Sequence, residues 1–129
     1  MSEARRTVDA EGAPEAIGPY NHAVAADGLL FCSGQIPLDP GSGELVGETA
    51  AEQATRCLKN LEAVCDAAGT TLAEAIRLTI YTTQLEKFAE INEAYAEFFP
   101  EAHPARAAVG VAALPKGAIV EIDAIVSLR

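Results

Sequence analysis

The chain is 129 residues long and carries a formal net charge of −10 at pH 7. This length fits one domain and leaves no room for a second, so we expect one domain over residues 1–129. The acidic balance argues against nucleic acid or an anionic membrane as the main partner, because both are bound through basic patches. Half of the residues are hydrophobic but only 5% are aromatic, so the core has to be built from Ala, Val, Leu and Ile.

The cysteines and histidines give no sign of a metal site or of export. Three cysteines are an odd number without a Cys-x-x-Cys pair, and neither they nor the two histidines have the spacing of zinc ligands. No apolar segment follows the N-terminus, and no uncharged stretch reaches the ~18 residues of a membrane span. We therefore expect a cytoplasmic protein without a metal, a membrane partner or a nucleic-acid partner.

The first third of the chain predicts an edge strand and a β-hairpin. Asp27-Gly28 is a strong hairpin dipeptide between two short apolar runs. Gly34, inside the second run, indicates a bulge or a close approach of the backbone to a ligand. Gly18-Pro19-Tyr20 predicts a tight turn that presents the tyrosine. The expected strands are residues 5–8, 23–26 and 29–36, with a loop over residues 9–18.

The middle of the chain alternates between helix and strand. Thr49-x-x-Glu52 is a capping box, and apolar residues follow it at helical spacing until Gly69. In a second helical pattern, Asn92 lies on the same side as the apolar residues. The expected elements are a short strand over residues 44–46, a helix from Thr49 to Gly69, a strand over 76–84, and a helix over 86–98 whose buried stripe is Phe88, Ile91, Tyr95 and Phe98.

The last quarter predicts two strands that flank a Pro-Lys-Gly turn. With period two, Arg106 and Ala108 lie on a nearly bare face of the first strand, while Glu121 and Asp123 lie opposite the apolar face of the second. A solvent-facing sheet would show more and longer polar groups than this. We interpret these residues as one face that packs against another copy of the sheet, with Arg106 at its margin facing an anion. The expected ranges are 106–113 and 119–128.

Apart from the short strand over residues 44–46, the predicted order is three strands, a helix, a strand, a helix and two strands. This order indicates an α+β fold in which two helices cover one face of a mixed sheet.

Motifs for catalysis are absent: the sequence has no P-loop, G-x-G-x-x-G, G-x-S-x-G or H-E-x-x-H. His22 follows a turn and His103 precedes a proline, so both are expected as surface loop histidines rather than catalytic bases. Cys32 has no base close to it in the sequence, which favours a buried strand cysteine over a nucleophile.

Other polar residues leave alternatives open. On spacing alone, Arg106 pairs more often with a structural acid, such as Glu121 or Asp123, than with a ligand. Tyr20 either packs over its turn or faces a ligand, and Asn92 either bridges backbone groups or lines a site. None of these signals is specific alone.

Taken together, several blocks resemble the RidA (reactive intermediate/imine deaminase, YjgF) family, and the resemblance runs from about residue 7 to the C-terminus. The blocks that carry it include Ala16-Ile17-Gly18-Pro19-Tyr20, Phe31-Cys32-Ser33-Gly34-Gln35-Ile36-Pro37, Gln53-Ala54 with Asn60-Leu61, Pro104-Ala105-Arg106, and Leu114-Pro115-Lys116-Gly117-Ala118-Ile119-Val120-Glu121.

This resemblance implies a chorismate-mutase-like fold and a homotrimer whose sheets face inward, with ligand clefts between neighbouring subunits. It also implies a cofactor-free 2-iminobutanoate/2-iminopropanoate deaminase. Such an enzyme hydrolyses reactive enamines and imines, among them 2-aminoacrylate and 2-iminobutyrate, to 2-keto acids and ammonia.

The resemblance also implies roles for individual residues. Arg106 matches the arginine that grips the substrate carboxylate, and Glu121 matches the glutamate that holds or polarises the attacking water. Tyr20 matches a tyrosine beside the ligand, and Asn92 matches an asparagine that lines the cleft.

Other positions match the substrate-binding backbone or depart from the family pattern. Ser33 and Gly34 match the strand whose backbone approaches the substrate. Ala108 stands where many members have a cysteine that contributes mainly backbone, and Asn21-His22 stands where Ser-Gln is common. These departures concern the substrate range.

Two alternative functions remain at this stage. One is a regulatory module that binds 2-keto acids without catalysis. The other is a translation-inhibiting endoribonuclease, against which stand the net charge and the lack of a histidine pair placed for RNA cleavage.

Overall fold

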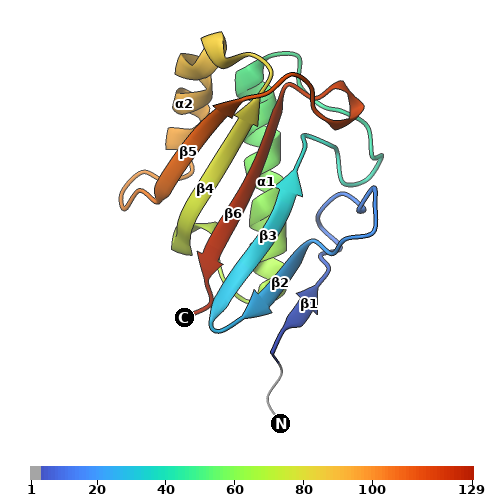
Figure 1. The fold of residues 1–129 in the computed structure, drawn as a ribbon, viewed down its shortest axis with the longest axis vertical. Helices are drawn as coiled ribbons and strands as arrows, with labels where there is room; N and C mark the ends of the chain where they lie inside the picture. Colours follow the sequence, from blue (N-terminus) through green and yellow to red (C-terminus); the bar gives the residue numbers. More distant parts are fainter. Residues whose placement is uncertain (1–3) are drawn as a thin grey trace.

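The computed structural model describes residues 4–129, which form one six-stranded sheet with two α-helices (Figure 1). The strand order is β1-β2-β3-β6-β4-β5, and only β4 and β5 run parallel. The elements are β1 (Arg6–Val8), β2 (Ala23–Ala26), β3 (Leu29–Gln35), α1 (Ala50–Ala68), β4 (Ala75–Thr82), α2 (Phe88–Ala96), β5 (Ala105–Gly110) and β6 (Val120–Ser127).

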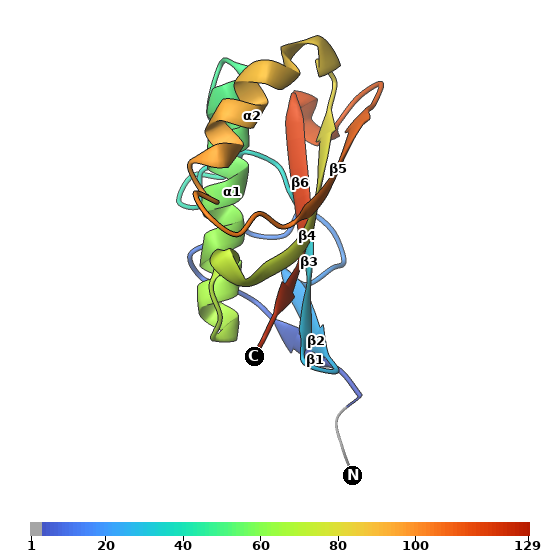
Figure 2. The ribbon, with the colours of Figure 1, turned by 90° about the vertical axis from the view of Figure 1, so that its left-hand side faces the viewer.

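Both helices lie on the same face of the sheet, which confirms the α+β architecture expected from the sequence (Figure 2). Alternate residues of the central strands face the helices, and Ile80, Val120 and Ile122 are completely buried there. They pack with Leu58 and Leu61 of α1 in one apolar core. The opposite face of the sheet is not covered by any element of residues 4–129 (Figure 2).

The hairpin and the irregular strand form as predicted. Asp27 and Gly28 both have positive φ, 55° and 77°, which is the conformation of the tight turn between β2 and β3. The pairing of β3 with β6 shifts its register between Cys32 and Gln35, so the bulge expected near Gly34 is present.

Helix α1 begins and ends as its sequence indicates. The Thr49 hydroxyl accepts a hydrogen bond from the Glu52 amide at 3.1 Å, and the Glu52 carboxylate accepts one from the Thr49 amide. Gly69 ends the helix with a φ of 87°, in the left-handed region where glycine is favoured. No helix within residues 4–129 has both the length and the apolar character needed to cross a membrane.

Three predicted elements are shorter than expected. The strand expected over residues 106–113 ends at Gly110. The strand expected over residues 44–46 is only an isolated bridge between Leu38 and Leu45. The second helix starts with a separate 3-10 turn, Leu85–Lys87, before α2 proper, and it ends at Ala96 instead of residue 98.

A buried amide of α1 fixes the chain that leaves β3. The Asn60 side chain is completely buried, and its Nδ2 donates to the carbonyl oxygens of Ile36 and Leu38 at 3.3 and 3.1 Å. Its Oδ1 accepts from Arg56 Nε at 3.1 Å. Because buried carbonyls need partners, this amide holds the β3 exit in place.

We therefore expect Asn60→Ala to lower the free energy of unfolding by about 1–3 kcal/mol, because it leaves the Leu38 carbonyl without a donor, whereas the Ile36 carbonyl still accepts from the Leu38 amide. Urea unfolding followed by circular dichroism measures this loss. Arg56→Ala is the matched control, since it removes only a partly exposed donor, and it should cost less than about 1 kcal/mol. Equal losses in the two variants would contradict the role assigned to the amide.

Candidate functional site

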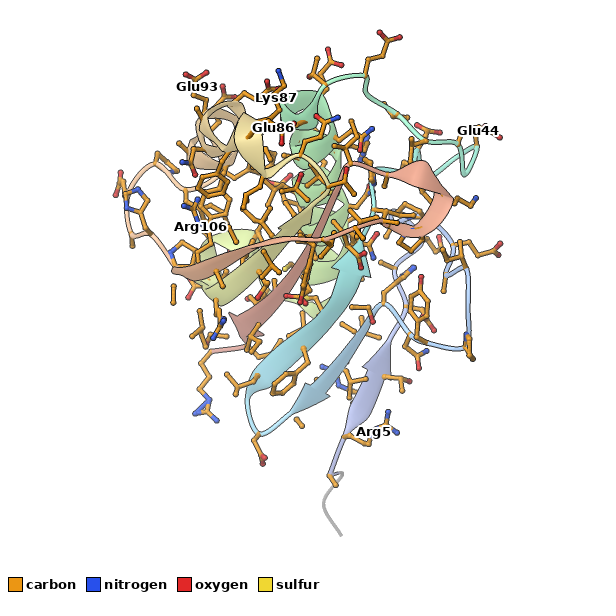
Figure 3. The ribbon with its side chains drawn as sticks, turned by 45° about the horizontal axis from the view of Figure 1, so that its top comes forward. Arg5, Glu44, Glu86, Lys87, Glu93 and Arg106 are labelled. Atoms are coloured by element: carbon orange, nitrogen blue, oxygen red, sulfur yellow. The ribbon has the colours of Figure 1, made fainter. Side chains whose placement is uncertain are left out.

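The guanidinium of Arg106 lies against α2 and is held there by neutral groups (Figure 3). Its Cζ is 5.1 Å from the centre of the Phe88 ring and 4.8 Å from that of Tyr95. Its Nη1 donates a hydrogen bond to Asn92 Oδ1 at 2.7 Å. Aromatic faces attract a cation and the amide fixes its orientation, but none of these groups neutralises its charge.

A cavity of about 470 Å³ adjoins this guanidinium. Asn92, Tyr95 and Arg106 line it together with Ala96, His103 and Pro104. Arg106 is exposed in the single chain, so its unneutralised charge is accessible from this cavity. A planar fork of N–H donors in such a position can bind a small carboxylate through two parallel hydrogen bonds.

The Tyr95 side chain contacts Arg106 through its ring and not through its hydroxyl. The hydroxyl oxygen is buried and finds no hydrogen-bond partner within residues 4–129. Burial raises the pKa of this phenol, and the nearby Arg106 opposes that shift. The phenol therefore stays neutral, and its contact with Arg106 is a cation–π contact.

The sheet pairing corrects the expectation that Arg106 shares a face with Glu121 and Asp123. Arg106 pairs with Leu78, which faces the helices, whereas Tyr81 and Thr79 on the other face of β4 pair with Glu121 and Asp123. Paired residues point to the same side of a sheet. Arg106 therefore lies on the helix side and both carboxylates lie on the open side.

Two further consequences follow from this register. A structural ion pair between Arg106 and either carboxylate, favoured on spacing alone, is wrong, because β4 separates their strands and the side chains point in opposite directions. Ala108 pairs with Ile80 and shares the face of Arg106, so its predicted place beside that residue is confirmed.

Glu121 lies over the bulge of β3. A Cβ atom added to Gly34 would collide with Glu121 Oε2, so only a glycine lets the carboxylate occupy this position. Burial, and then the nearby Asp123, raise the pKa of the Glu121 carboxyl above its ordinary value of 4.5. A carboxyl with a raised pKa can accept and return a proton more readily near neutral pH than an ordinary one.

Ser33 and Tyr20 belong to the same region as Gly34. The Ser33 hydroxyl donates to the carbonyl oxygen of Asn21 at 2.7 Å, which ties β3 to the loop that carries Tyr20. Tyr20 and Gly34 line one narrow cavity. The Tyr20 hydroxyl accepts a hydrogen bond from the Ile17 amide at 3.3 Å, so the side chain packs over its own turn, and with 43% of its surface exposed the ring is also open to a partner.

The site residues expected from the sequence thus form two groups. Arg106, Asn92 and Ala108 lie at the β5 and α2 edge, and Tyr20, Ser33, Gly34 and Glu121 lie around the β3 bulge. Sequence reasoning missed that Phe88 and Tyr95 hold Arg106, although both share a helical face with Asn92, which was the available signal.

Among the remaining candidate residues, His103 and Cys32 lie where the sequence predicted, and His22 does not. His103 is exposed, as expected of a surface loop. His22 was also expected at the surface, but it is only 5% exposed, because backbone groups of its own loop close around the ring. Cys32 is buried in β3, and contact with Cys65 together with burial raises the pKa of its thiol, so it is a core residue, as predicted.

No group of three or more histidine, cysteine, aspartate or glutamate side chains in the described part of the chain is arranged to hold a metal ion.

The raised pKa of Glu121 predicts how its substitution changes stability with pH. The folded state disfavours the charged form of Glu121. Above the folded-state pKa the carboxylate therefore lowers the free energy of unfolding. Below 4.5 it has no such effect, because the group is protonated in both the folded and the unfolded chain. Glu121→Gln should therefore unfold at a higher temperature than wild type at pH 8, and this difference should vanish by about pH 4. Thermal unfolding across this range measures the difference. Glu93→Gln, which removes the same charge at an exposed helical position, is the control, and an equal pH dependence in the two variants would contradict the role of Glu121 burial.

Comparison with known proteins agrees with this architecture. Residues 10–128 match the model of a family described as Endoribonuclease L-PSP. The RutC family protein y4sK of Sinorhizobium fredii is 50% identical over 121 residues, which are 94% of this chain and 96% of that protein. The human 2-iminobutanoate/2-iminopropanoate deaminase is 43% identical over 121 residues, which are 94% of this chain and 88% of that enzyme.

Solved structures agree as well. The crystal structure of YyfA from Yersinia pestis, a protein of the conserved Rid family, is 42% identical and has a TM-score of 0.92, over 96% of this chain and 99% of that one. With this fold and these relatives, the chain belongs to the RidA/YjgF family.

Proposed function

We propose that this protein is a 2-iminobutanoate/2-iminopropanoate deaminase, which hydrolyses 2-imino and 2-enamino acids to 2-keto acids and ammonia without a cofactor. The observation that carries this proposal is the Arg106 guanidinium, held by two aromatic rings and one neutral amide beside a cavity. The human relative named for this activity supports it.

The small size of the substrate explains the need for this arginine. Even the best tiny ligands gain no more than about 1.5 kcal/mol for each heavy atom, so a small imino acid needs a charge clamp to bind. Its permanent charged group is the carboxylate, and a guanidinium matches that shape with two hydrogen bonds. Asn92 and the two rings orient the guanidinium before the substrate arrives, which lowers the ordering cost of binding.

The chemistry then needs a water molecule and a group that moves protons. A 2-enamino acid first takes a proton on its β-carbon and becomes an iminium, whose carbon is electrophilic. Glu121 accepts a proton from water as the oxygen bonds to that carbon, and it returns the proton to the nitrogen. The C–N bond then breaks, ammonia leaves, and loss of the hydroxyl proton gives the 2-keto acid.

This mechanism needs two copies of the chain, because one chain holds Arg106 and Glu121 on opposite faces of its sheet. We propose a homotrimer in which the open faces pack inward and each site lies between neighbouring subunits. Phe31 and Val109 are exposed apolar side chains on that face, and they favour its burial against another subunit.

The direct test is Arg106→Ala. We expect it to lower kcat/KM for freshly generated 2-iminobutyrate by about a thousandfold, because both the charge and the paired hydrogen bonds to the carboxylate are lost. Ammonia release in a coupled assay with an amino-acid dehydratase measures the rate, and light scattering after gel filtration shows that the assembly survives.

Lys87→Ala is the matched control. It removes a cation at the start of α2, on an exposed position that does not line the cavity, and it should leave the rate unchanged (Figure 3). Full activity in Arg106→Ala would refute the assignment. Binding of 2-oxobutanoate by a wild-type protein that does not accelerate imine loss would instead support a regulatory binding module.

A further inference from the structure

His22 is a buried imidazole that the proposed reaction does not use. It lies in the segment that joins β1 to β2, and only 5% of its surface is exposed. Its Nδ1 lies 2.8 Å from the backbone nitrogen of Ala10, and its Nε2 lies 2.7 Å from the carbonyl oxygen of Pro14. Both ring nitrogens therefore bind backbone groups of the same loop.

These two contacts fix the protonation state of the ring. The Ala10 amide can only donate, so Nδ1 must present a lone pair. The Pro14 carbonyl can only accept, so Nε2 must carry the hydrogen. The geometry thus requires the neutral tautomer with hydrogen on Nε2. A base in catalysis would need a free nitrogen facing the substrate, which this ring does not have.

The loop that this ring closes is the one that carries Tyr20. His22 is attached to β3 through its own carbonyl, which accepts from the Ser33 amide at 2.9 Å. The Asp9 carboxylate, at the beginning of the loop, accepts from the Asn21 side chain at 3.0 Å. Both ends of the loop are therefore fastened beside the β3 bulge.

His22 also lies next to the candidate site in space. Tyr20, Gly34 and His22 line the same narrow cavity. On the other side, the ring adjoins a hollow of about 600 Å³ whose titratable groups are Asp9, Glu11 and Glu15. Both hydrogen bonds of the ring go to backbone groups of the loop. The three carboxylates line the neighbouring hollow and accept no hydrogen bond from the ring.

We propose that His22 is a positioning residue of the deaminase site: as a neutral donor and acceptor it closes the loop after β1 and so places Tyr20 beside Gly34. This proposal rests on the proposed function, because it takes Tyr20 to contact the substrate. It assigns a role to a residue that touches neither the substrate nor the reacting atoms.

Two substitutions separate hydrogen bonding from volume. Glutamine at this position, His22→Gln, offers an amide oxygen to Ala10 and an amide N–H to Pro14, so it can replace both contacts. His22→Leu fills the space but can replace neither. We expect His22→Leu to raise KM for 2-iminobutyrate roughly tenfold with kcat changed less than about twofold, and His22→Gln to keep both near wild type.

Nuclear magnetic resonance on the wild-type protein tests the same idea without any variant. The ¹⁵N signals of His22 should show hydrogen on Nε2 and none on Nδ1, and the Ala10 amide should exchange slowly with solvent. The opposite tautomer, or rapid exchange at Ala10, would overturn the proposal even if His22→Leu failed to fold.

The outcomes also distinguish this proposal from the proposed function. If wild type is active and His22→Leu has an unchanged KM, the positioning role of His22 is overturned while the proposed function stands. The same holds if His22→Gln is as impaired as His22→Leu. Wild type that does not turn over 2-iminobutyrate overturns the proposed function, whether or not it binds 2-oxobutanoate, and the positioning role in a deaminase site falls with it.

Discussion

The contact between one guanidinium and two aromatic rings is the interaction on which this site depends. Arg106 could have been neutralised by a carboxylate of its own chain, and it would then have been a structural residue. Instead it lies on Phe88 and Tyr95 and donates to the neutral Asn92. Its position is fixed while its charge is left for an anion, and the adjacent cavity can admit a small one.

The pairing of β4 with its two neighbours decides how the rest of the site can be built. Because β5 and β6 pair with β4 through alternate residues, Arg106 and Glu121 are directed to opposite faces. A reaction that needs both groups at one substrate therefore has to join two chains. The uncovered face, the exposed apolar side chains on it and the polar residues around the β3 bulge are all consistent with that requirement.

Features set by local chemistry could be predicted from the sequence. The capping box at Thr49, the Asp27-Gly28 turn and the alternation along β6 depend on residues close together in the chain, and the structure has all three. The resemblance supplied the candidate site residues, because the blocks that contain them are distinctive. The bulge at Gly34 was also predictable, since a glycine inside a strand usually marks one.

Features set by contacts between distant segments could not be predicted. Alternation shows which residues of β5 share a face, but it does not show which face meets the helices, because that depends on the register with β4. The contact of Arg106 with Phe88 likewise depends on where α2 lies over the sheet. His22 looked like an ordinary loop histidine because its partners are backbone groups, which leave no mark in the sequence.

The central claim is that each site takes Arg106 from one chain and Glu121 from its neighbour. The most direct test mixes two variants, Arg106→Ala and Glu121→Gln, each of which we expect to be inactive alone. The two proteins are unfolded together in equal amounts and refolded, so that mixed assemblies form. Random assembly gives an intact pair at about one site in four, so about a quarter of the wild-type rate should return. If mixing restores no activity, both residues of each site come from the same chain and the account is contradicted.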